Sequence, residues 1–214
     1  MAHTQRSHPL TRPPVTVRLN SARCQLRRSQ PADAPALFEA TRNAEFIRWL
    51  GWSRPRSLKE VERRLSRMQR QWHEGSYALT ALLRGHAAAR GDGPRIVGGI
   101  DLKPDAFLSD EDVLNLGYWT HPHWQNRGFG TEFVCCAISW AFELGIEGLV
   151  AGVALENTPS HRLLRRLGFR PFEQCAVRTR RQAFLNVRYY LTRSQWRVRD
   201  SRTAGGAADG GPQL

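Results

Sequence analysis

The spacing of apolar residues divides the chain into an early helical part and a later part rich in strands. Apolar residues recur every three or four positions in residues 30–43 and 44–52, which predicts two short helices. At Ser57 the sequence SLKE has the pattern of a capping box, in which the serine caps a helix and Glu60 reaches back to its start. We therefore expect a polar amphipathic helix from Ser57 to about residue 74.

From residue 76 onward the pattern favours strands that alternate with two further helices. The expected strands lie at residues 23–28, 76–84, 95–103, 112–120, 148–157, 169–177 and 184–192. A helix over 131–144 is apolar almost all round, so we expect it to be buried against a sheet. A second helix begins near Thr158, with Pro159 in its first turn and Gly168 at its end. This order of elements predicts one mixed α/β or α+β domain over residues 21–199.

Length and composition agree with a single globular domain. The chain has 214 residues, of which 41% are hydrophobic and 24% charged, which is ordinary for one sizeable core. Residues 1–20 lack periodicity and residues 200–214 are rich in Gly and Ala, so we expect both ends to be flexible or disordered. The longest apolar stretch, FVCCAISWAF, is too short to cross a bilayer, and the N-terminus lacks a secretory signal. We therefore expect a cytoplasmic protein without membrane contact.

The net charge of +13 comes almost entirely from arginine. Such a charge attracts polyanions, which include nucleic acid, the ribosomal surface, acidic proteins and phosphorylated cofactors. The alternative is that arginine merely keeps the protein soluble, and we prefer it for most of these residues because they do not gather in one stripe. The four cysteines lack a CxxC spacing, which argues against a zinc site and favours buried, reduced thiols. We expect no metal.

The segment GYWTHPHWQNRGFGT joins a predicted strand to the predicted helix that follows it. Gly128 and Gly130 stand where this helix begins, and the first turn of a helix has unpaired N–H groups and partial positive charge. Glycines allow the N–H groups from about Asn126 to Thr131 to converge on one anion, and Arg127 adds positive charge. A phosphate or pyrophosphate is the expected ligand. A tight strand–helix turn without any ligand is the alternative for this fragment alone.

Four segments, in the same order, resemble one family. QNRGFG matches the Q/R-x-x-G-x-G/A signature of the GNAT superfamily, the acetyl-CoA-dependent N-acetyltransferases. LGYWTHPHWQNRGFGTE is similar to a run in its Rim-type subfamily, which includes ribosomal-protein N-terminal acetyltransferases. ENTPSHRLLRRLGF and VRYYLTRSQW resemble two later segments of that subfamily. The resemblance covers roughly residues 20–196.

The resemblance implies an α+β GNAT fold. Its sheet would be mostly antiparallel, with about six or seven strands splayed by a bulge at the cofactor site, and about four or five helices would flank it. The backbone near Tyr118, Trp119 and Thr120 would pair with the pantetheine arm of acetyl-CoA. The expected cofactor-binding residues are Tyr118, Trp119, Thr120, Gln125, Asn126, Arg127, Gly128, Phe129, Gly130, Thr131, Asn157, Ser160 and Arg165. Arg162 and Arg165 would meet the 3′-phosphate or adenine, or simply form a solvated helix face.

The resemblance also implies direct transfer of the acetyl group to an amine. Ser160 stands where Rim-type enzymes carry a serine that protonates the departing thiolate, and Asn157 would hold pantetheine or a water molecule. Relatives often place a glutamate where this chain has Asn115, and an asparagine can orient a water molecule but cannot act as a base. The other candidates for the base are Asp101, Glu111, Asp112 and Glu156, each of which is also an ordinary surface acid. The loop residues His121 and His123 are expected to be solvated.

Three functions remain open. A site poor in bases favours an amine of low pKa, so a protein or peptide N-terminal α-amine, of the ribosomal-protein type, is our first choice. The second is the same chemistry on a small amine, such as an antibiotic, an amino acid or a polyamine. The third is a basic nucleic-acid or ribosome-binding module that lost catalysis. The expected partners are acetyl-CoA and the acceptor; contact with an acidic protein or the ribosome is left open, as is a homodimer.

Overall fold

The computed structural model describes residues 13–50, 53–84, 95–105, 112–178 and 183–197. Its strands are β1 (Arg18–Asn20), β2 (Cys24–Arg28), β3 (Tyr77–Leu83), β4 (Ile96–Pro104), β5 (Val113–Thr120), β6 (Gly148–Ala154), β7 (Arg170–Arg178) and β8 (Ala183–Thr192). Its labelled helices are α1 (Ala34–Ala40), α2 (Ala44–Trp49), α3 (Leu58–Arg70), α5 (Phe129–Glu143) and α6 (Thr158–Arg166), and residues 193–197 are also helical. Three short 3₁₀ turns are η1 (Pro31–Asp33), η2 (Gln71–Glu74) and η3 (Pro122–Trp124). The predicted order of elements is confirmed.

All eight strands join one sheet in the order β1-β2-β3-β4-β5-β6-β8-β7. Only β5 and β6 pair in parallel, so the sheet is mostly antiparallel, as predicted. The strand that sequence patterns did not indicate is β1, which lies in the segment expected to be flexible up to residue 20. Its three residues are too short for a visible alternation, and their backbone pairs with β2, whose outer edge would otherwise be exposed.

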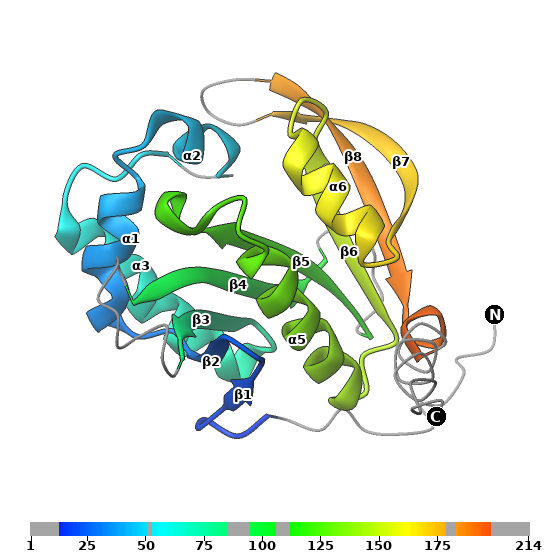
Figure 1. The fold of residues 1–214 in the computed structure, drawn as a ribbon, viewed down its shortest axis with the longest axis horizontal. Coiled ribbons are helices and arrows are strands. Elements are labelled where there is room, and N and C mark those ends of the chain that lie inside the picture. Colours follow the sequence, from blue (N-terminus) through cyan, green and yellow to red (C-terminus); the bar gives the residue numbers. More distant parts are fainter. Residues whose placement is uncertain (1–12, 51–52, 85–94, 106–111, 179–182, 198–214) are drawn as a thin grey trace, which may run out of the picture.

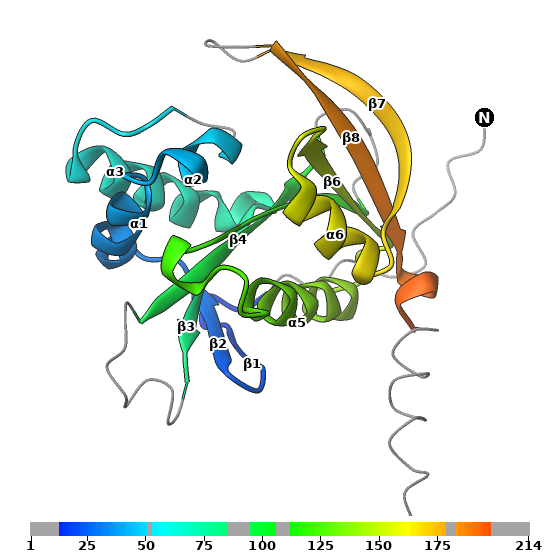
Figure 2. The same cartoon turned by 45° about the horizontal axis from the view of Figure 1, so that its top comes forward.

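Helices cover both faces of the sheet (Figure 1). Helix α5 crosses the front, whereas α3 passes behind β3 and β4 with α1 at its side on the left, and Figure 2 shows the same layers after a turn. The larger core fills the α5 side and includes Phe133, Ile138 and Leu149. A smaller core joins α1, α2 and α3 through Leu37, Phe46 and Val61, among others. As predicted, α5 is buried against the sheet.

The sheet opens between β5 and β6. The two strands pair only where Val113–Asn115 lie beside Gly148–Val150, yet β5 stays paired to β4 as far as Thr120 and β6 to β8 as far as Ala154. The expected bulge near Tyr118 is absent, because the β4–β5 register runs without a shift from Leu114 to Thr120. The predicted splay is therefore present, but it arises because each strand follows its outer partner and the two diverge.

The helix ends explain some differences from the predicted bounds. Ser57 is the N-cap of α3, but its side chain makes no capping bond, and Glu60 instead accepts the N–H of Arg56 at 2.9 Å. Helix α6 follows the prediction, with Asn157 as its N-cap and Gly168 beyond its end in the left-handed region at φ 92°. Among the helices described above, none is long and apolar enough to cross a membrane.

Candidate active site

The turn before α5 has the backbone geometry of an anion site. Asn126 and Gly128 both lie in the left-handed region, at φ 59° and 80°, and Gly128 is the N-cap of α5. The first helical bond is donated by the N–H of Glu132 to the carbonyl of Gly128 at 3.2 Å. The N–H groups of Phe129, Gly130 and Thr131 come earlier and so have no acceptor in the helix. Alternating backbone conformations and a free first turn together make a cradle for an anion.

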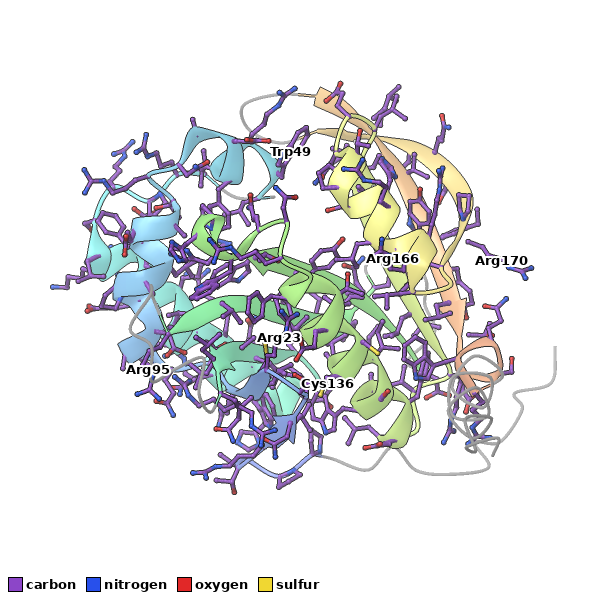
Figure 3. All side chains as sticks on the ribbon, viewed as in Figure 1. Arg23, Trp49, Arg95, Cys136, Arg166 and Arg170 are labelled. Atoms are coloured by element: carbon purple, nitrogen blue, oxygen red, sulfur yellow. The ribbon has the colours of Figure 1, made fainter. Side chains whose placement is uncertain are left out.

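Arg23, from the turn before β2, braces this loop (Figure 3). Its Nε donates to Glu132 at 2.7 Å, its Nη1 donates to the carbonyl of Arg127 at 3.2 Å, and its guanidinium lies 4.1 Å from the ring centre of Phe129. Burial alone would raise the pKa of Glu132, but bonds from the N–H and side chain of Arg23 and from Ser21 bring that pKa below its ordinary value. Sequence reasoning missed Arg23, because more than a hundred positions separate it from the loop.

The free edge of β5 presents backbone groups to the gap in the sheet. The N–H of His121 donates to the carbonyl of Val97, so His121 faces the β4 side. Because backbone groups alternate along a strand, those of Thr120, Tyr118 and Leu116 face β6 instead. Beyond Asn115 they have left the β5–β6 pairing, and they can therefore pair with an extended ligand.

Trp119 faces the other way and forms a wall of the site. The same alternation turns its backbone toward β4, so it is not available to a ligand in the gap, unlike the neighbouring groups of Tyr118 and Thr120. Its ring packs edge-on against Phe46 of α2, with 5.8 Å between ring centres. It lies across Gly99, where a Cβ would sit 2.5 Å from the indole Nε1, so only glycine allows this close approach.

A cavity of about 760 Å³ links the α5 loop, the gap in the sheet and the α3 side. Most of the predicted site residues line it: Tyr118, Trp119, Thr120, Gln125, Asn126, Gly128, Gly130, Thr131, Asn157, Ser160 and Arg162. Asn115, Arg127, Phe129 and Arg165 do not belong to its lining. The structure thus gathers most of the predicted set from three separate segments and leaves four predicted residues outside.

Local geometry explains why three of these four residues do not line the cavity. The ring of Phe129 is buried against Trp124, so only its backbone N–H is left for a ligand. Arg127 is exposed and lies over Trp124 on the outer side of the loop. On α6, residues four apart share a face, so Arg162 and Arg166 line the cavity together while Arg165 points elsewhere. Helical spacing in the sequence could have indicated Arg166, which is labelled in Figure 3.

The fourth residue, Asn115, belongs to a buried polar network and not to the cavity wall. Its amide donates to Asp105 at 3.0 Å, and Asp105 pairs with Arg188 of β8 at 2.9 Å. Arg188 also pairs with Glu173 of β7 at 2.7 Å. Asn115 therefore ties β5 to the end of β4 and to the last hairpin, and its predicted role of orienting a catalytic water is not supported by its position. The sequence carries no sign of this network, because its members lie far apart.

Tyr118, Asn157 and Ser160 lie together beside the gap. The Oδ1 of Asn157 accepts the N–H of Ser160 at 3.3 Å, so Asn157 caps α6 and keeps only its amide N–H groups for a ligand. The hydroxyl of Tyr118 reaches the carbonyl of Ser160 at 3.5 Å. Burial raises the pKa of Tyr118 to about 12, although the bond to Ser160 opposes the shift and Tyr189 adds to it. Tyr118 therefore carries its proton at neutral pH.

Three of the four candidate acids lie within the described residues, and the structure separates these three. Asp101 lines the cavity. Glu156 is exposed and lies 3.7 Å from Arg48 at the surface. Asp112 is outside the cavity lining, and its carbonyl accepts the backbone N–H groups that begin β6. Glu111 lies outside the described residues.

Asp101 lies on β4 opposite Gly117, and its side chain faces α3. About one third of the side chain is exposed (34%), and Lys103 lies 3.7 Å away. Burial raises the pKa of Asp101, while the positive charges of Lys103 and Arg64 oppose that shift. A carboxylate with a raised pKa is a stronger base than an ordinary surface acid, which makes Asp101 the best placed candidate for proton removal.

His121 differs from the prediction of a solvated loop residue. It is buried, and burial lowers the pKa of its ring despite the opposing charge of Glu39. Its Nδ1 accepts the N–H of His123 at 3.3 Å, which shapes the η3 turn. His123 is exposed, as predicted, and neither ring lines the cavity. His121 thus supports the shape of the loop.

Comparison with known proteins places these features in a family. A family model described as the acetyltransferase (GNAT) domain matches residues 23–170. The chain is 30% identical over 155 residues to the uncharacterized N-acetyltransferase YoaA of Bacillus subtilis, which covers 71% of this chain and 81% of that protein.

Two solved structures show the same fold. The ribosomal-protein-S5-alanine acetyltransferase of Vibrio fischeri has a TM-score of 0.68 at 16% identity, covering 84% of this chain and 98% of that one. RimJ of Mycobacterium smegmatis, in complex with CoA-disulfide, has a TM-score of 0.68 at 18% identity, covering 84% and 88%. The anion cradle, the splayed sheet and the family match lead to one conclusion: the chain belongs to the GNAT family and is an N-acetyltransferase that uses acetyl-CoA.

Proposed function

We propose that the enzyme acetylates the N-terminal α-amine of a protein or peptide. The observation that carries this proposal is the setting of Asp101, an acid in the cavity wall whose pKa burial raises and the positive charges of Lys103 and Arg64 lower. Lys103 and Arg64 disfavour a cationic acceptor at that point, so the incoming amine must lose its proton easily. An α-amino group has a pKa near 8 and is neutral in about a tenth of molecules at neutral pH, whereas a lysine is almost wholly charged.

Acetyl-CoA would bind along the start of α5, the free edge of β5 and helix α6. Its pyrophosphate would be held by the N–H groups at the start of α5, and its pantetheine arm would pair with the edge of β5 at Tyr118 and Thr120. Arg162 and Arg166, which line the cavity from α6, would meet the 3′-phosphate. This arrangement brings the thioester to the gap between β5 and β6, with Asp101 on the α3 side of the same cavity.

The chemical step then needs three contributions from the protein. Asp101, directly or through a water molecule, would take the proton of the attacking amine. A free N–H of β5 would donate to the thioester oxygen as negative charge develops there. The C–N bond forms, the C–S bond breaks, and the thiolate takes a proton from Ser160, which would regain one from water in the cavity. Asn157 would orient the pantetheine or a water molecule through its amide N–H groups.

A protein acceptor is also in keeping with one structural neighbour, whose name gives an alanine of ribosomal protein S5 as its substrate. A small amine, the second function left open by the sequence, uses the same chemistry and differs only in the acceptor. The relative rates of the two acceptor types therefore decide between them.

The test is an acetyl-CoA turnover assay on matched acceptors. One peptide carries a free N-terminus and no lysine, and its partner carries one lysine and a blocked N-terminus; spermidine and an aminoglycoside complete the set. We expect kcat/KM for the free N-terminus to exceed that for the lysine peptide by at least about tenfold, because far more of the α-amine is neutral. Mass spectrometry would locate the acetyl group. Faster acetylation of lysine, spermidine or the aminoglycoside would contradict the proposal.

A further inference from the structure

A second cavity, of about 580 Å³, lies beside the first, between α3 and the end of β4. The two cavities share four wall residues: Arg64, Met68, Asp101 and Lys103. The acid that we propose as the base therefore lies where the two spaces meet. An acceptor whose amine reaches Asp101 from the α3 side must leave the rest of its chain in the second cavity.

One face of α3 supplies most of the charge in this second cavity. Glu60, Arg63, Arg64, Arg67 and Gln71 recur at three- and four-residue spacing along the helix, and all of them line it. Lys103 of β4 faces them across the cavity.

The negative charges in this cavity are already engaged. The Glu60 carboxylate accepts the backbone N–H of Arg56 at 2.9 Å, and the Asp101 carboxylate lies 3.7 Å from Lys103. Arg63 and Arg67 are exposed, and within the described part of the chain no carboxylate lies at ion-pair distance from either. The cavity therefore presents a positive surface to whatever enters it.

We propose that this second cavity holds the residues that follow the acceptor's N-terminal amine and that it selects acidic side chains there. The inference rests on the proposed function, since it requires a peptide acceptor, and it adds the class of peptide. Carboxylates at the second to fourth positions of the acceptor pair with Arg63 and Arg67, while the amine lies at Asp101. Exposed ion pairs are individually weak, so the selection amounts to a preference and falls with rising salt.

Three peptides test this inference. They share a free N-terminus and differ only at positions two to four, which are glutamate, glutamine or lysine. We expect kcat/KM to fall in that order, with about a tenfold difference between the acidic and basic peptides at low ionic strength and a smaller one at high salt. The difference should appear mainly in KM, because the charges act on binding and not on proton transfer.

The matched variants are the double substitution Arg63→Glu with Arg67→Glu and the single substitution Arg70→Glu. Arg70 is exposed on the same helix but lines neither cavity, so it controls for the loss of positive charge on α3. The double variant should lose or reverse the order of the three peptides, whereas Arg70→Glu should keep the wild-type order. The thermal shift with acetyl-CoA confirms that each variant is folded, and Arg67→Gln replaces the double variant if the latter does not fold.

Two negative results have different meanings. Equal rates on all three peptides, or a preference that survives in the double variant, overturns the acidic selection and leaves N-terminal acetylation standing. Acetylation of small amines alone, with no turnover of any peptide, overturns the proposed function and this inference with it.

Discussion

At the residue scale, the sequence showed that Asp101 is an acid on a strand but not that it lines the cavity. Four acids were candidates for the base, and only the register that sets Asp101 opposite Gly117, with its side chain toward α3, selects one of the described three. Asn115 lies on β5, within the strand that the sequence predicted. Its amide donates to Asp105 and so does not reach the site. Residue types and spacing in the sequence identified the candidate bases. Choosing among them required knowing which residues each side chain contacts, and those residues come from distant strands.

Replacing Asp101 with asparagine tests its role as the base. We expect kcat/KM at neutral pH to fall by about 10²- to 10⁴-fold, the usual contribution of a positioned base. In the wild type, activity should also fall as the pH drops through the pKa of Asp101, which burial raises above its ordinary value of 3.8, because the protonated acid cannot accept a proton. The pH–rate profile of the variant should lack this limb and keep only that of the amine.

Two controls make the Asp101 result interpretable. Glu45→Gln changes another acid in the same cavity and should leave the rate unchanged. Binding of acetyl-CoA to Asp101→Asn should match the wild type, because the residue lies on the α3 side. A variant with a wild-type rate and pH profile would exclude Asp101 as the base.

At the scale of elements, the start of α5 was predictable and its support was not. Gly128 and Gly130 mark the helix start in the sequence, and the structure places the N-cap at Gly128. The turn before β2 contacts this helix start through Arg23 and Ser21, which is a tertiary contact without a sequence pattern. The family resemblance predicted the gap between β5 and β6. The structure shows its cause, which is that β5 stays paired to β4 and β6 stays paired to β8.

Replacing Glu132 with glutamine should loosen this contact. The side chain of Glu132 bonds to Arg23 and Ser21, and we expect its loss to lower the free energy of unfolding by about 1–2 kcal/mol at pH 7. The folded-state pKa of Glu132 is below its ordinary value of 4.5, so the stabilisation is complete above that value and is lost as the pH falls through the folded pKa. Urea unfolding at several pH values measures this difference.

The matched control is Glu143→Gln, an exposed acid at the other end of α5. It should change the free energy of unfolding little at any pH. If Glu132→Gln were as stable as the wild type at pH 7, the contact would not hold the helix start in place.

At the scale of the whole molecule, the order of elements and the single family were evident from the sequence, but the cavity was not. The cavity is built from α1, α2 and α3, four strands, the α5 loop and α6, so its walls come from nearly the whole described length. The net charge of +13 indicated an attraction to anions without saying where. The structure locates one concentration of that charge, on α3 beside Asp101, which is where the selection of acidic acceptors is proposed.

The central claim is that the backbone at the start of α5 holds the pyrophosphate of acetyl-CoA. Calorimetric titration of acetyl-CoA into the wild type, Gly128→Val and Gly75→Val tests it most directly. Gly75 has φ 82° against 80° for Gly128 and lies outside both cavities, so the two variants share the same backbone strain. We predict that Gly128→Val weakens binding by about 100-fold, through lost N–H bonds to phosphate, and that Gly75→Val binds as the wild type does. Equal affinities of Gly128→Val and the wild type would contradict the account.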